Sequence, residues 1–124
     1  MSFTRDVTMY SASEQFPVPH GDHRQAVVMA DKLPPGNWLL WAMLHASDAW
    51  GGSNYWLDPQ PAGFIGNLGV SVFFPDNKAS SLTVNSPVSA ARTTEDTDLV
   101  FQVITRSPDR AVTGTLYVQG VKLG

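Results

Sequence analysis

Apolar and polar residues alternate with a period of two along much of this chain, a pattern that predicts β-strands. The segment 38–45 differs from the others because it is apolar in both phases of the alternation. Successive side chains of a strand point to opposite faces, so this strand would present an apolar row on each side. One row is expected in the core, and the other needs a second partner. The first row contains Trp38, Leu40, Ala42 and Leu44, and the second contains Leu39, Trp41, Met43 and His45.

The same alternation predicts further strands along the chain. Glycine at position 66 predicts a kink or bulge within one of them. Residues 11–14 are expected to break the first strand. Residues 16–19 are expected at a sheet edge or in a connection, because their two prolines remove donors from the ladder. The predicted strands cover 3–10, 25–30, 64–74, 81–84, 99–104 and 112–123.

Turn-forming residues separate these strands and predict the connections between them. The segment 47–61 has no sustained period and is expected to be the longest loop. A turn at 107–110 predicts that the last two strands form a hairpin. One short helical turn at 46–50 or at 89–93 is left open. The other expected connections are a loop at 20–23, a turn at 31–37 and a polar connection at 87–97.

About eight strands separated by turns at short intervals predict an all-β protein, either a sandwich, a jelly roll or a small barrel. We select an antiparallel jelly-roll-like β-sandwich. The length of 124 residues fits a single domain over 1–124. Whether residues 1–13 form a strand of that domain or an N-terminal arm exchanged with a neighbouring copy is left open.

Composition and charge exclude several functional classes. The content of 43% hydrophobic and 15% charged residues argues against disorder. The net charge of −3 offers no basic track for a phosphate backbone, so no nucleic-acid partner is expected. The absence of cysteine excludes disulfides and thiolate-bound zinc. No run approaches about 18 apolar residues and the N-terminus lacks a signal-peptide pattern, so we expect neither a membrane partner nor export by a cleaved signal.

No segment carries a catalytic signature, and we expect no enzyme activity and no cofactor. The serines lie in no nucleophile elbow, and the glycines form no phosphate-binding loop. His20, His23 and His45 are the weak candidates for metal ligands. A His-x-x-His spacing in a loop is more often solvated surface, so the preferred prediction is that no metal is bound.

Aromatic and short polar residues in the expected loop 47–61 predict a glycan site. Aromatic faces stack on sugar rings while a few polar atoms fix their orientation. The alternative, which we prefer, is that these aromatic rings pack in the core or in a subunit contact, where such residues are enriched. The candidate glycan-binding residues are Trp50, Asn54, Tyr55, Trp56 and Asp58.

Residues 35–42, Pro-Gly-Asn-Trp-Leu-Leu-Trp-Ala, resemble the entry into a central strand of C1q/TNF-like jelly rolls. They also resemble strands of small β proteins in tailed-phage virions. Residues 113–123 resemble the closing strand of such domains, and 96–103 the strand before it. This resemblance covers about a quarter of the chain. It implies a jelly roll that packs around a threefold or related axis and carries no catalytic residues. The chain lacks the mid-domain Asn/Gly patterns of C1q domains, which favours the viral proteins.

We therefore predict a structural virion protein, such as a capsid decoration, head spike, fibre or tail component, assembled in the host cytoplasm. Its expected partners are other copies of itself, as a trimer, and other virion proteins. The predicted contact residues are Leu39, Trp41 and Met43, because large apolar patches are rare on soluble monomers. The rival predictions are a carbohydrate-binding or receptor-binding module and a small cupin-like metalloenzyme.

Overall fold

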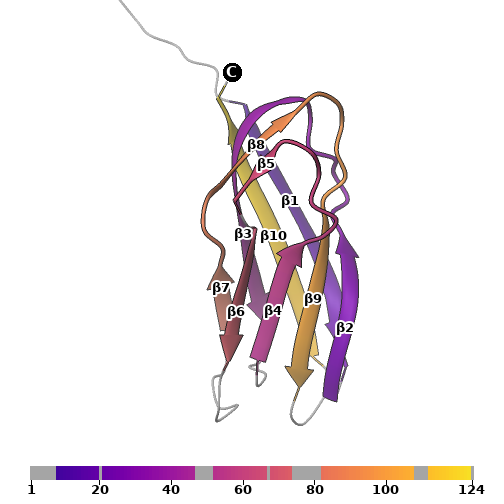
Figure 1. The fold of residues 1–124 in the computed structure, drawn as a ribbon. Coiled ribbons are helices and arrows are strands. Elements are labelled where there is room, and N and C mark those ends of the chain that lie inside the picture. The colour runs from indigo at the N-terminus through magenta and orange to yellow at the C-terminus, as the bar shows by residue number, and fades with distance from the viewer. Residues whose placement is uncertain are drawn as a thin grey trace, which may run out of the picture.

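The computed structural model describes residues 8–19, 21–46, 52–66, 68–73, 82–107 and 112–123, which form two packed antiparallel sheets (Figure 1). The six-stranded sheet has the order β1-β10-β3-β8-β5, with β7 also paired to β3, and the four-stranded sheet has the order β2-β9-β4-β6. The described residues contain no helix that could cross a membrane. The strands are β1 (Met9–Val18), β2 (Gly21–Val28), β3 (Gly36–Ala46), β4 (Gly52–Leu57), β5 (Phe64–Ile65), β6 (Gly69–Phe73), β7 (Leu82–Asn85), β8 (Ser89–Thr93), β9 (Val100–Ser107) and β10 (Val112–Lys122).

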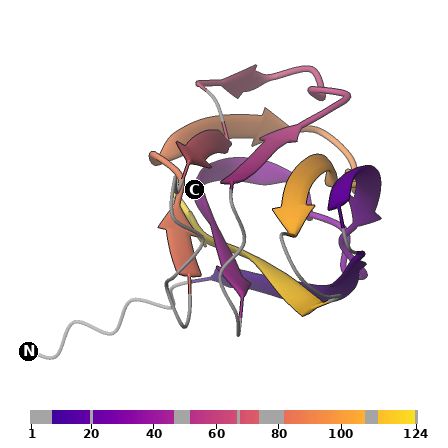
Figure 2. The same ribbon diagram turned by 90° about the horizontal axis from the view of Figure 1, so that it is seen from below.

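The strand pairs are nested, as in a long hairpin rolled into a sandwich. β1 pairs with β10, β2 with β9, β3 with β8 and β4 with β6. Consecutive strands alternate between the sheets except β7 and β8, and the two layers enclose a common interior (Figure 2). This topology confirms the predicted jelly-roll-like sandwich. The predicted hairpin of the last two strands is wrong, since β9 and β10 lie in different sheets. A turn signal does not show whether a chain returns beside its strand or crosses to the opposite layer.

β1 corrects the predicted N-terminal organisation. Residues 11–14 continue the strand instead of breaking it, and all of β1 pairs with β10 of the same chain. Residues 9–13 are therefore part of the domain, while 1–7 lie outside the described residues. The strand persists because its inner residues are buried between the sheets. Pro17 is tolerated because β1 is an edge strand, as expected, and its carbonyl accepts a hydrogen bond from Gln25 Nε2 at 2.6 Å.

Three predicted connections contain strands. Residues 21–23 belong to β2, β4 lies within the expected loop 47–61, and β8 lies within the expected connection 87–97. The short helical turn that was left open at 89–93 does not form, since these residues are strand β8. β4 and β8 are short, and small polar residues weaken their alternation, yet Tyr55 and Ala91 are buried in the core. Packing against the opposite sheet overrides the weak local signal.

The predicted strand 64–74 bends at Gly66, and the bend moves the chain from one sheet to the other. β5 pairs with β8 in the six-stranded sheet, whereas β6 pairs with β4 in the four-stranded sheet. Gly66 has a φ of 95°, which favours glycine. A Cβ at this position would also lie 3.0 Å from the Ser89 hydroxyl oxygen. The kink was predicted, but the change of sheet was not.

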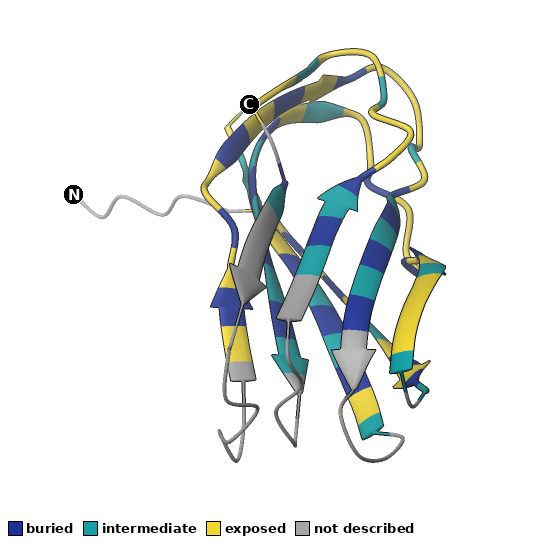
Figure 3. Cartoon of the chain, turned by 60° about the horizontal axis from the view of Figure 1, so that its bottom comes forward, coloured by how far each residue is buried: buried dark blue, intermediate teal, exposed yellow. Residues whose placement is uncertain are grey.

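The inner row of β3 occupies the centre of the core. Its four apolar side chains are at most 1% exposed, in agreement with the predicted alternation. The Trp38 ring meets the Tyr10 ring edge-on, with centroids 6.3 Å apart, and its Nε1 donates to the Pro34 carbonyl. Buried and exposed positions alternate along the strands of both sheets (Figure 3). Other large, fully buried side chains are Tyr55, Phe101, Met29, Leu33, Leu68, Leu99 and Leu116.

A serine side chain repairs the ladder where β3 changes partners. β3 pairs with β8 over its first half and with β7 over its second half, which leaves Ala42 between them. The Ala42 N–H donates to the Ser86 hydroxyl at 2.8 Å, and the Ala42 carbonyl accepts from the Ser86 N–H at 2.8 Å. From the opposite sheet, the Tyr55 hydroxyl donates to the Val84 carbonyl at 2.9 Å. The buried backbone at this break is therefore hydrogen-bonded.

We expect Ser86→Ala to destabilise the fold by about 1–3 kcal/mol, because the Ala42 N–H would be buried without a partner. Urea denaturation measures this loss. Ser13→Ala is the matched control, because Ser13 is exposed on β1 and its substitution should change stability by less than about 0.5 kcal/mol. Equal stabilities of the two variants would contradict the role assigned to the Ser86 hydroxyl.

Two buried tyrosines predict loss of stability in alkali. Burial, and then the charge of Asp31, raise the pKa of Tyr10 from 10.0 to about 12, and burial raises the pKa of Tyr55 further. Because the unfolded chain releases the Tyr10 proton near pH 10, the stabilising effect is complete below that pH and is lost as pH rises to about 12. Urea midpoints measured across this range should fall, and less steeply for Tyr10→Phe. Parallel curves for the two proteins would refute this assignment.

Candidate interaction surfaces

The outer row of β3 lies on the outer face of the six-stranded sheet. Leu39, Trp41 and Met43, the predicted contact residues, are all half-buried. Trp41 Nε1 donates to Gln119 Oε1 of the neighbouring strand β10 at 3.1 Å. Residues of the neighbouring strands cover the edges of these side chains, but no second layer of the described chain covers the row. The outer row is thus not sealed inside one copy of the protein.

Four of the five exposed large hydrophobic residues among the described residues lie on this same face. They are Met9 at 58% exposure, Ile65 at 73%, Val88 at 62% and Leu123 at 62%. The pairing register connects them, because Met9 is opposite Val121, Val121 opposite Leu39, Leu39 opposite Ala90, and Ala90 opposite Ile65. This row crosses five strands.

Val88 and Leu123 extend that row along the strands. Val88 lies between Ser86 and Ser89, which contact β3 at Ala42 and Leu40, so it lies beside Trp41. The Leu123 N–H donates to the Asn37 carbonyl at 2.7 Å, which fixes Leu123 beside the start of β3. We define the apolar patch as Met9, Leu39, Trp41, Met43, Ile65, Val88, Ala90, Val121 and Leu123.

The outer face of the six-stranded sheet is almost free of charge. Arg92, which is opposite Asn37, is the one Lys, Arg, Asp or Glu among the described residues that the register places on this face. His45 lies at the other end, where its Nδ1 is 2.9 Å from the Thr83 hydroxyl oxygen. The remaining polar groups are hydroxyls and amides. Depletion of charge distinguishes the centres of protein interfaces from other surfaces.

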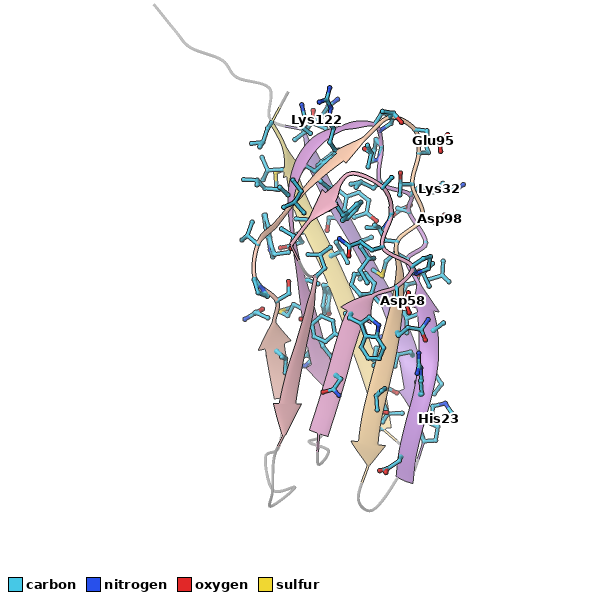
Figure 4. All side chains as sticks on the ribbon, viewed as in Figure 1. His23, Lys32, Asp58, Glu95, Asp98 and Lys122 are labelled. Atoms are coloured by element: carbon cyan, nitrogen blue, oxygen red, sulfur yellow. The ribbon has the colours of Figure 1, made fainter. Side chains whose placement is uncertain are left out.

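The predicted glycan residues separate into two environments. Tyr55 is 1% exposed and its hydroxyl donates to backbone carbonyls inside the sandwich, so its ring packs in the core. Asn54 and Trp56 are half-buried on the outer face of the four-stranded sheet, and Asp58 is exposed just beyond β4 (Figure 4). Trp50 lies outside the described residues. The structure thus places Asn54 and Trp56 together, without Tyr55.

Arg24 is part of this second surface and was not among the predicted site residues. Its guanidinium carbon lies 5.4 Å from the centroid of the Trp56 ring. β2 and β4 flank β9, and Gln102 of β9 is opposite both Ala26 and Trp56. Alternation over 21–28 was the available signal, but residues 20–23 were predicted to be a loop. We define the Trp56 surface as Arg24, Asn54, Trp56 and Gln102.

The weak metal candidates do not converge. His23 is exposed on β2 of the four-stranded sheet (Figure 4). His45 lies on the outer face of the six-stranded sheet, beside Thr83. His20 lies outside the described residues. Across the described ranges, no group of three or more His, Asp or Glu side chains is arranged to hold a metal ion.

A pocket of about 470 Å³ lies between residues 61–63 and 92–98, at the end of the sandwich where Glu95 and Asp98 lie (Figure 4). Asp98 also forms an exposed ion pair with Lys32, with 3.9 Å between the charged atoms. No predicted site residue lines this pocket.

Comparisons with known proteins give no assignment. No protein-family model matches this chain, and a sequence search of curated proteins finds no match. The proposals for its function depend on the two outer faces of the sandwich.

Proposed function

We propose that this protein is a structural component of a virion that self-associates through the apolar patch. The observation that carries the proposal is the concentration of exposed hydrophobic residues on one nearly uncharged face. Exposed apolar area of this kind costs free energy in water, about 25 cal/mol per Å², and association removes it. The predicted residues Leu39, Trp41 and Met43 lie within this patch, on strand β3.

The dimensions of the face suit a stable interface. The strands β1, β10 and β3 and the row of β8 and β7, spaced about 4.8 Å apart and about nine residues of about 3.3 Å long, give the face roughly 570 Å², which the two-residue strand β5 extends. One partner contributes about 800 Å² to a standard protein interface. Half-buried Trp41 near the centre is the residue type that most often dominates binding energy. A second copy of the chain offers the same face and needs no further partner.

The viral assignment has support from the resemblance and from the topology. The segments that resemble phage virion proteins and C1q/TNF-like domains include β3 and β10, the adjacent strands that carry much of the patch. Jelly-roll sandwiches are a common architecture of viral structural proteins. The resemblance implies threefold packing, so a trimer is the oligomer that we propose.

Exposed positions provide the clearest test of self-association. The double variant Ile65→Asp, Val88→Asp places two charges in the patch at residues that are 73% and 62% exposed, so the fold should tolerate both. We expect association at least about a hundred-fold weaker, because charges buried in an interface without partners cost several kcal/mol. Light scattering after size exclusion measures the mass.

Val28→Asp is the matched control for this experiment. Val28 is 53% exposed but lies on β2 of the four-stranded sheet, so its variant should keep the wild-type mass. Trp41→Asp should also give a smaller soluble species. A wild-type protein that is monomeric at micromolar concentration, or a double variant of unchanged mass, would overturn self-association through this face.

The virion assignment needs a separate measurement. Antibodies against the protein should label particles purified from its source, as seen by immunogold electron microscopy. Labelling confined to the soluble fraction would contradict a structural role in the particle while leaving self-association intact.

A further inference from the structure

The Trp56 surface lies on the sheet opposite the apolar patch and differs from it in chemistry. Arg24 is exposed and Trp56 is half-buried, with the guanidinium over the indole ring. Within the described parts of the chain, no carboxylate forms an ion pair with Arg24. The guanidinium fork, with five N–H donors, thus packs on the ring and has no carboxylate partner among the residues that the structure describes.

We propose that the Trp56 surface binds a saccharide that carries a carboxylate. The Arg24 guanidinium donates two hydrogen bonds to the carboxylate, and the Asn54 and Gln102 amides on the same face bond the hydroxyl groups of the sugar. Arginine and carboxylate match in such bidentate pairs, which are stronger than neutral hydrogen bonds.

The position of Arg24 selects for charge in the ligand. A neutral pyranose that stacked on the indole would displace the guanidinium and lose the cation–π contact. A carboxylate adds to the outer edge of the guanidinium and leaves that contact in place. The ligand that gains most from this geometry is therefore anionic.

Two side-chain amides on this face are available to hydrogen-bond the hydroxyl groups of a sugar. Asn54 and Gln102 are half-buried on the same face, and neither side chain is hydrogen-bonded to another described residue. Amides both donate and accept, as hydroxyl groups require. Asp58, two residues beyond Trp56, adds an exposed acceptor. Asp22 also lies on this face but is engaged in an interaction of its own.

Isothermal titration with D-glucuronic acid and, in parallel, D-glucose tests this proposal. Wild-type protein should bind the acid and bind glucose at least about ten-fold more weakly, the ratio that corresponds to about 1.4 kcal/mol. Arg24→Gln should lose at least about ten-fold in affinity for the acid, since it removes the hydrogen bonds between the guanidinium and the carboxylate. Arg24→Lys keeps the positive charge but lacks the guanidinium fork, so its affinity for the acid should lie between those of wild type and Arg24→Gln. Binding of the acid should weaken as salt rises.

Arg92→Gln is the matched control, because it removes the arginine on the opposite outer face and should bind like wild type. The proposal would be overturned if the acid did not bind at millimolar concentration or if glucose bound equally well. It would also be overturned if Arg24→Gln had the same affinity for the acid as wild type. Light scattering on the same samples separates it from self-association. A monomer that binds the acid contradicts only the oligomer, and an oligomer that ignores it contradicts only this site.

Discussion

The inner row of β3 is the contact on which the rest of the sandwich depends. Trp38, Leu40, Ala42 and Leu44 lose nearly all exposure because the four-stranded sheet covers them from the opposite side. β3 also pairs with β10, β8 and β7, so it organises its own sheet. The Ser86 and Tyr55 hydroxyls complete the hydrogen bonds where its partners change. A single strand thus carries both the central apolar packing and the buried hydrogen bonds of the sandwich.

Burying one side of each sheet leaves two outer faces, and the chain gives them different chemistry. The outer face of the six-stranded sheet gathers apolar side chains and has little charge, which suits contact with a second protein surface. The outer face of the four-stranded sheet carries an arginine on an indole ring beside two free amides, which suits a small polar ligand. The two faces lie on opposite layers, so the proposed self-association through one face would leave the other accessible.

Sequence reasoning predicted most of the long strands, apart from β1, but not the contacts that depend on the pairing register. β3 was predicted because it is a long segment that is apolar in both phases, and β9 and β10 because apolar residues recur at alternate positions. β4 and β8 are short and owe their strand geometry to packing. Trp41 was predicted because the whole row lies within one segment. Arg24 and Trp56 lie 32 positions apart in the sequence and meet only when β2 and β4 flank β9. The exposed part of the patch was missed for the same reason, since it comes from Met9, Ile65, Val88 and Leu123.

The pairing of β1 with β10 sets the order in which the molecule can be built. Met9 is opposite Val121, so one of the first described residues can pair only after one of the last has been synthesised. A ribosome that synthesises the chain from its N-terminus must release nearly all of it before either edge of β10 can find its neighbours. Until then the apolar side chains of β1 and β3 are open to other nascent chains, and contacts so distant in sequence form slowly. In this topology, apolar strand faces therefore stay exposed through most of the synthesis of the chain.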